Sequence, residues 1–108
     1  MSWTVVFVNA LARAELDALP SDMRMRFGHI TRLIRDFGLP KVHEPYVKHL
    51  AGKLWEMRLT GRDGIARSIY VTASGRRVVV LRTFIKKTEK TPPREMEIAM
   101  ARAREIAE

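Results

Sequence analysis

Six basic side chains between Leu54 and Lys90 have the chemistry needed to bind and cleave a phosphodiester. They are Arg58, Arg67, Arg82, Lys86, Lys87 and Lys90. Arginine is permanently charged and binds phosphate oxygens in a bidentate manner, so it can stabilise negative charge on a phosphoryl group. Lysine can act as an acid or a base near neutral pH once neighbouring cations lower its pKa. The residue types therefore predict a polyanion-binding site.

Metal-free RNA cleavage is one reaction that such a site could perform. The ribose 2′-hydroxyl attacks the adjacent phosphate and expels the 5′-oxygen, so the protein must remove one proton, stabilise phosphoryl charge and supply another proton. Clustering of Lys86, Lys87 and Lys90 near Arg58 and Arg67 would provide the required field. Lysine pairs at strand ends are also common as solvated ends, so the pattern alone leaves both interpretations open.

Other chemistries lack a motif in this sequence. The three histidines are scattered, there is no cysteine and no His-Glu-x-x-His, so we expect no metal site. There is no Walker loop and no Gly-x-Gly-x-x-Gly, and we expect no cofactor. No Gly-x-Ser-x-Gly elbow supports a Ser-His-Asp triad.

Length and charge set the broad class. The 108 residues suit a single domain, 1–108, that can bury a core without disulfides. The absence of cysteine and of a signal-like or membrane-spanning segment at the N-terminus favours a cytoplasmic protein. A net charge of +8 favours nucleic acid or an acidic protein as the partner, although a solvated basic surface is the alternative.

The first half of the chain predicts a strand followed by two helices. Residues 3–8 form a β-branched and aromatic run that suits a strand buried on both faces better than an edge strand. Asn9 can cap a helix over residues 10–19, and Ser21 with Asp22 can cap a second helix over residues 23–37, whose arginines we assign to a solvated face. Residues 41–53 are the least regular part, with a short helical turn as one interpretation.

The second half predicts a three-stranded meander and a final helix. The strands cover residues 54–59, 65–72 and 77–85, joined by glycine turns. Alternation places Trp55, Met57 and Leu59 on one face, which we expect to pack against the helices. Thr91 is the expected N-cap of the last helix, with Pro92 at its first position. The fold class is α+β.

Three motifs in this order resemble the RelE/ParE toxin superfamily, and within it the phage-derived, HigB-like branch. They read LWEMR at residues 54–58, DGIAR at 63–67 and FIKKTEKTP at 84–92. The resemblance implies a RelE-like fold and a toxin of a type II toxin–antitoxin system. It further implies a metal-independent, ribosome-dependent mRNA endonuclease whose partners are mRNA, the ribosome and an antitoxin often carrying a helix-turn-helix, with no membrane.

The resemblance also assigns roles to residues. Arg58 and Arg67 would bind phosphate and stabilise the transition state, and Lys86 and Lys87 would bind RNA or substitute for a general base and acid. Nucleic-acid contacts are expected from four further cations, namely Lys53, Arg77, Arg82 and Lys90.

The general base is left open by the sequence. Some branches of the superfamily use a Tyr or His near the sheet end, and this chain has neither after Tyr70. His43, His49 and Tyr46 are reserve candidates. Two other functions also remain open at this point: a non-catalytic ParE-like toxin that inhibits DNA gyrase, and a basic RNA-binding module.

Overall fold

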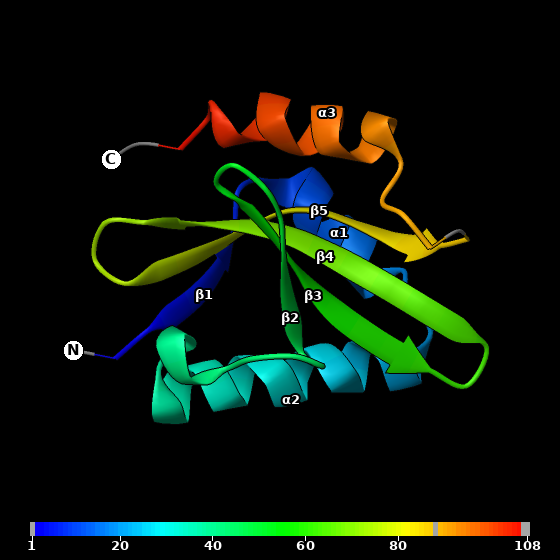
Figure 1. Cartoon of the computed structure of the whole chain (residues 1–108), viewed down its shortest axis with the longest axis horizontal. Coiled ribbons are helices and arrows are strands. Elements are labelled where there is room, and N and C mark those ends of the chain that lie inside the picture. The colour runs from blue at the N-terminus through cyan, green and yellow to red at the C-terminus, as the bar shows by residue number, and fades with distance from the viewer. Residues whose placement is uncertain (1, 88, 107–108) are drawn as a thin grey trace.

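A five-stranded sheet lies between helices in the computed structural model, which describes residues 2–87 and 89–106 (Figure 1). The strand order is β1-β5-β4-β3-β2, with β1 parallel to β5 and the other pairs antiparallel. The elements in chain order are β1 (Thr4–Phe7), α1 (Ala10–Asp17), α2 (Ser21–Phe37), the 3-10 turn η1 (Leu39–Lys41), β2 (Val47–Ala51), β3 (Leu54–Gly61), β4 (Gly64–Ala73), β5 (Arg77–Lys86) and α3 (Pro93–Ala103). The predicted α+β fold with its meander of β3, β4 and β5 is confirmed.

The first core lies between α2 and one face of the sheet. Met23, Phe27, Ile30 and Ile34 project from α2 at helical spacing and pack on the sheet, where Met57 and Leu59 are fully buried. The predicted side of β3 is therefore confirmed for these two residues. Trp55, on the same side, is 39% exposed.

The second core lies on the opposite face, beneath α3. It contains Leu54, Ile69, Val71, Val79, Leu81 and Ala99. In Figure 1, α3 and α2 lie on opposite sides of the sheet. None of the helices within residues 2–87 and 89–106 has the length and apolar character of a membrane span.

The N-terminal strand departs from its prediction. β1 is an edge strand that pairs only with β5, and its residues alternate between exposed and partly buried, with Val6 38% exposed. A β-branched run predicts extended backbone but does not determine how many strands flank it. The parallel pairing is possible because β1 and β5 are far apart in the chain, with α1, α2, β2, β3 and β4 between them, whereas a tight hairpin can join only antiparallel strands.

The edge strand β2 was not predicted. Residues 41–53 were expected to be irregular with a helical turn, yet Val47–Ala51 pairs antiparallel with β3. Val47 is buried while Lys48 and His49 are exposed, so the first three side chains do not alternate between buried and exposed as a half-buried strand would. The pairing is decided by the free edge of β3, which the local sequence does not reveal.

Of the first two helix starts, one agrees with its prediction and one differs. Asn9 caps α1 as predicted, since its Oδ1 accepts the backbone N–H of Ala12 at 2.9 Å. The predicted Ser21 and Asp22 cap of α2 is wrong, because the helix already includes both residues after Pro20. Asp22 instead accepts the backbone N–H of Arg62 at 2.6 Å, which fixes the β3–β4 turn to the start of α2.

A β-bulge in β5 changes the side to which its residues point. Tyr70 is opposite Val80, whereas the preceding Ile69 is opposite Arg82, so Leu81 is an extra residue. Before the bulge, Val78 and Val80 belong to the core under α2. After it, the even-numbered positions of β5 lie on the other face of the sheet.

Candidate active site

The face of the sheet that carries α3 is only partly covered by that helix, and basic residues occupy the rest. Arg58 on β3 is directly opposite Arg67 on β4, and Arg67 is in turn opposite Phe84 on β5. Lys86 is two positions beyond Phe84 and therefore lies diagonally across from Arg67 on the same face. The structure thus brings together three of the four residues predicted to be catalytic. We call Arg58, Arg67 and Lys86 the cationic cluster.

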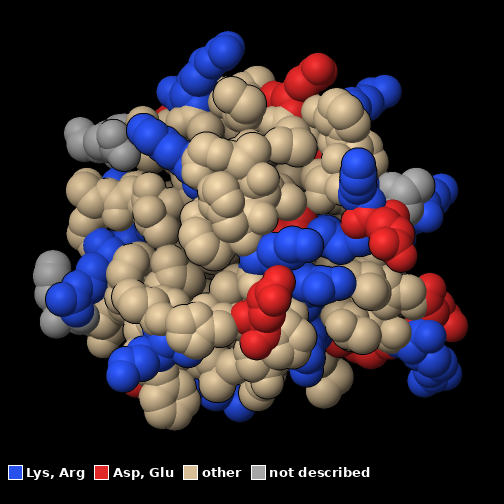
Figure 2. Space-filling view, in the orientation of Figure 1, with Lys and Arg blue, Asp and Glu red and all other residues tan. Residues whose placement is uncertain are grey.

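The space-filling view shows how this charge is distributed. Lys and Arg side chains gather on the right of Figure 2, between the levels of α3 and α2, with acidic side chains beside them. Two like charges directly opposite each other on neighbouring strands destabilise a sheet. Such an arrangement is unfavourable for folding alone and favourable for binding an anion.

Arg67 is buried and is paired with a buried carboxylate. Its side chain is 5% exposed, that of Glu56 is fully buried, and Arg67 Nη1 donates a hydrogen bond to Glu56 Oε2. Burial lowers the pKa of Arg67, although a guanidinium stays protonated at physiological pH. The Nε–H of Arg67 has no hydrogen-bond acceptor within the described residues. A buried donor without an acceptor costs about 1–3 kcal/mol, so an incoming phosphate oxygen that accepted this hydrogen bond would stabilise the site.

Arg58 differs from its neighbour in being partly exposed. Its guanidinium forms no ion pair with any residue in 2–87 or 89–106, while its backbone N–H donates to the carbonyl of Tyr46 at 2.8 Å. The charge of Arg58 is therefore available to a ligand on the open face.

Lys86 differs from an ordinary surface lysine in that its pKa is lowered. Its partial burial, and next the charges of Arg67 and Arg58, lower the pKa of Lys86, with Glu89 acting in the opposite direction. Lys48 on β2 contributes to the same lowering. Lys48 is directly opposite Glu56, which places it on the face of the cationic cluster.

Lys87 and Lys90 lie in the connection between β5 and α3. Both are exposed. Lys87 directly follows the last residue of β5, next to Lys86 in the chain. Residue 88, part of the predicted FIKKTEKTP motif, lies outside the described residues.

Arg82 forms ion pairs with two carboxylates. Its Nη1 donates to Glu15 at 2.6 Å and its Nε donates to Glu95 at 2.7 Å. Glu15 also accepts hydrogen bonds from Arg102 and from the backbone N–H of Thr83. The four side chains join α1, β5 and α3, so the charge of Arg82 is largely balanced within the protein.

The two remaining predicted nucleic-acid contacts lie elsewhere. Lys53 is exposed in the β2–β3 turn, where it lines a groove beside α3 with Leu54 and Met100. Arg77 is at the start of β5, at the opposite end of that strand from Lys86, and its Nε donates to the carbonyl of Ser74 at 2.8 Å. The structure does not bring either residue to the cationic cluster.

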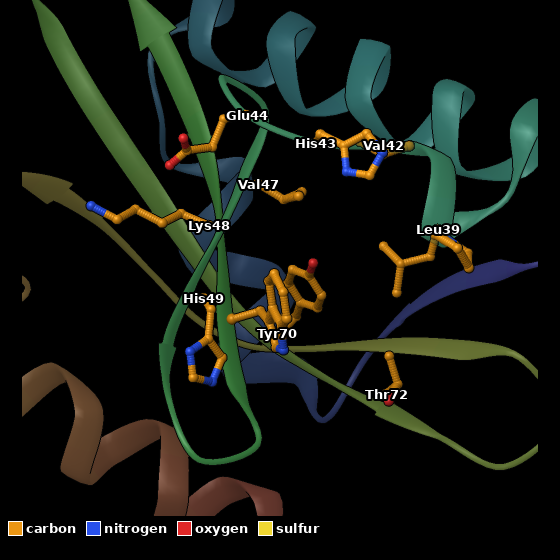
Figure 3. Close-up of a pocket in the computed structure, with 11 residues that line it drawn as sticks. Leu39, Val42, His43, Glu44, Val47, Lys48, His49, Tyr70 and Thr72 are labelled. Carbon is orange, nitrogen blue, oxygen red and sulfur yellow. The ribbon is translucent and has the colours of Figure 1, made fainter.

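Of the three reserve candidates for a general base, His43 follows η1 and Tyr46 contacts α2, whereas His49 is on β2, with its Nε2 2.8 Å from the carbonyl oxygen of Gly52. His43 and His49 line a cavity of about 750 Å³ together with Leu39, Val47 and Tyr70, the last two being part of the core under α2 (Figure 3). Burial raises the pKa of Tyr70, so its hydroxyl remains protonated. Tyr46 packs under the guanidinium of Arg26, 5.0 Å from the ring centre. Lys48 also borders the cavity, but in Figure 3 its side chain points away from it.

Sequence reasoning missed the roles of Glu56, Lys48 and Thr91 in this region. Thr91 was expected to cap the last helix, but α3 starts at Pro93 after Pro92, and Thr91 Oγ1 donates to Glu56 Oε1 at 2.9 Å. Glu56 is separated by one residue from Arg58 in a strand, which was a usable signal that the two share a face. Lys48 gave no such signal because its strand was not predicted.

The described residues include no group of three or more His, Asp or Glu side chains that could hold a metal ion. What the cationic cluster can do is bind a phosphate group between Arg58 and Arg67, beside a lysine whose pKa is lowered. Those are the requirements for stabilising a charged phosphoryl group and transferring a proton near it.

Comparisons with known proteins agree with the fold. Residues 14–104 match the family described as Phage derived protein Gp49-like (DUF891). The crystal structure of the archaeal RelE–RelB complex from Pyrococcus horikoshii OT3 contains a similar chain, with a TM-score of 0.61 and 20% identity over 81% of this chain and 98% of that chain. At this identity the likeness establishes a RelE-like fold. No curated protein matches the sequence.

Proposed function

The chain belongs to the phage-derived Gp49-like family, and from this membership and the cationic cluster we propose that it is the toxin of a type II toxin–antitoxin system. Its activity is that of a metal-independent endoribonuclease that cleaves mRNA, inhibits translation and stops growth. Within the RelE/ParE superfamily we assign it to the HigB-like branch. The RelE-like fold supports this proposal, and the order of the LWEMR, DGIAR and FIKKTEKTP motifs does so independently.

The observation that carries the proposal is the pairing of Arg58 and Arg67 beside Lys86 on one face of the sheet. In the proposed reaction the scissile phosphate binds to both guanidinium groups, which stabilise the charge that develops on its oxygens. Lys86, in its neutral form, accepts the proton of the attacking 2′-hydroxyl. Its lowered pKa increases the fraction of neutral amine at physiological pH.

Lys87 is the proposed donor of a proton to the departing 5′-oxygen. It is exposed and follows Lys86 directly, so it can approach the phosphate from the solvent side. Lys48 and Lys90 are proposed to bind the flanking RNA backbone. Action on ribosome-bound mRNA places the protein in the cytoplasm, with a cognate antitoxin as its second partner.

Induced expression of the wild type and of two variants tests this function. We expect the wild type to arrest growth and to create new 5′ ends in cellular mRNA. Lys86→Ala should abolish both effects, because it removes the proposed general base. Since Lys86 is at the end of a strand, its loss should perturb the fold little. Arg67→Ala should also abolish them, although it leaves Glu56 buried without its ion-pair partner. Arg32→Ala, an exposed change on α2, is the matched control and should remain toxic.

Growth arrest without cleavage would contradict the proposal. If expression leaves mRNA intact while DNA supercoiling changes, the protein acts on gyrase, as a ParE-like toxin would. If expression leaves growth and mRNA unchanged, a basic RNA-binding module is the better description.

A further inference from the structure

Glu56 is an acidic residue at the centre of a site that otherwise attracts anions. Its carboxylate is fully buried, on the same face as Arg58 and Arg67. A buried carboxylate needs partners for its oxygens, and each oxygen of Glu56 has one. Oε2 accepts from Arg67 Nη1, and Oε1 accepts from Thr91 Oγ1 at 2.9 Å.

The first contact fixes the position of Arg67. A guanidinium is planar, so a hydrogen bond to one Nη1 proton restrains the direction of all its other donors. The Nε–H of Arg67 remains without an acceptor among the described residues. Glu56 therefore holds Arg67 against repulsion from Arg58 and fixes the direction of its remaining N–H groups.

The second contact fixes the segment that follows the lysine pair. Pro92 and Pro93 have no N–H, which removes two of the backbone donors near the start of α3. The hydroxyl of Thr91 is not engaged in capping the helix and donates to Glu56 instead. Thr91 belongs to the connection that carries Lys87 and Lys90, so one carboxylate joins this connection to the guanidinium of Arg67.

We propose that Glu56 is a positioning residue for RNA cleavage, which sets the distance between Arg67 and the lysine-bearing β5–α3 connection through its hydrogen bond with Thr91. This inference rests on the proposed ribonuclease function. Arg67 binds the phosphate and the lysines transfer protons, whereas Glu56 and Thr91 touch neither the RNA nor the transferred protons. Their contribution is the alignment of the two groups.

Single-turnover cleavage of mRNA on programmed ribosomes tests the inference. Thr91→Val keeps the shape of the side chain and removes the hydroxyl, so the maximal rate should fall about tenfold while the half-saturating protein concentration changes less than about twofold. Thr91→Ser keeps the hydroxyl and should retain the wild-type rate. Urea unfolding of each variant shows whether the folded fraction has changed.

Glu56→Gln tests the role of the charge through the pH–rate profile, which a purely structural role of Glu56 would leave unchanged. The amide oxygen can still accept from Thr91, but the negative charge that balances Arg67 is lost, and Arg67 is one of the charges that lower the pKa of Lys86. The pKa of Lys86 should fall further, so the rising limb of the pH–rate profile should move to lower pH. Thr91→Val, which removes no charge, should leave that limb in place.

The outcomes separate the two proposals. If the wild type cleaves RNA and Thr91→Val cleaves equally fast, the positioning role is wrong while the ribonuclease function stands. The same conclusion holds if both variants lose rate only in proportion to their unfolded fraction and the limb for Glu56→Gln does not move. A wild type that cleaves no RNA contradicts the proposed function and the inference together.

Discussion

Lys86 is the residue whose proposed role gives the sharpest test. Its pKa is lowered by partial burial and by the charges of Arg67 and Arg58. A general base acts when deprotonated, so the cleavage rate should rise with pH and level off above the pKa of Lys86. Arg58→Gln should move this rise to higher pH, because removing a neighbouring cation raises the pKa of Lys86.

Lys86→Arg is the matched variant for this measurement. It keeps the positive charge for RNA binding, but a guanidinium does not lose its proton in this pH range. The single-turnover rate should fall by about 10²–10⁴ and the pH dependence from this residue should disappear. A retained wild-type profile in Lys86→Arg would exclude Lys86 as the base.

At the same scale, the sequence predicted which basic residues lie together better than it predicted which contacts hold them in place. Arg58, Arg67 and Lys86 were expected together, because alternation in strands and the motif order place them on one sheet. The ion pair of Glu56 with Arg67 and its bond to Thr91 depend on side chains 11 and 35 positions apart in the chain. A local sequence pattern does not predict contacts between side chains so far apart in the chain.

Among the elements, α1 and α3 are joined to β5 by an ion-pair network with a pH-dependent contribution to stability. Burial favours the protonated form of Glu15, but hydrogen bonds from Arg102, the Thr83 backbone and Arg82 outweigh it, so the pKa of Glu15 is lowered. This contribution is fully present above the unfolded pKa, near 4.5, and is lost as the pH falls through the lower pKa of the folded state.

Urea unfolding at several pH values measures this contribution. Glu15→Gln should lower the free energy of unfolding by about 1–3 kcal/mol at pH 7. The wild type should lose this advantage below about pH 4.5, so the two curves should converge in acid. Asp17→Asn removes an exposed pair with Arg13 on the same helix and should leave the unfolding midpoint unchanged. Parallel curves for wild type and Glu15→Gln would show that Glu15 titrates normally.

The prediction of helices and strands succeeded where a periodic pattern extends over many residues, and it failed at the edges of the sheet. The helices and the three-stranded meander have clear 3.6- and 2-residue patterns. The edge position of β1 and the existence of β2 were missed, because pairing depends on which partner strand is free. The bulge at Leu81 was also missed, since an apolar run such as RVVVL fits either parity.

For the whole molecule, the net charge of +8 predicts RNA binding that weakens with salt. Lys48 extends the cationic cluster to the open edge of the sheet at β2. Lys48→Ala should weaken RNA binding at low salt and reduce the slope of log affinity against log salt by about 0.7, the value for one phosphate contact on single strands. Filter binding of a short RNA over a range of salt concentrations measures both.

The control for that experiment is Arg32→Ala, which removes one charge from the exposed face of α2 on the opposite side of the sheet. It changes the net charge equally but should leave the slope unchanged. Equal effects of the two variants would mean that RNA binds by diffuse attraction and that the edge at β2 is no part of its path.

The bulge at Leu81 changes which alternate positions of β5 face each side of the sheet. The first half of that strand supplies Val78 and Val80 to the core under α2, and its second half supplies Lys86 to the cationic cluster. If all ten residues of β5 alternated strictly, with no bulge, Val78, Val80 and Lys86 would share a single face, and the lysine would point toward the apolar layer. The bulge thus keeps Val80 in the core under α2 while Lys86, later in the same strand, lies on the face of the cationic cluster.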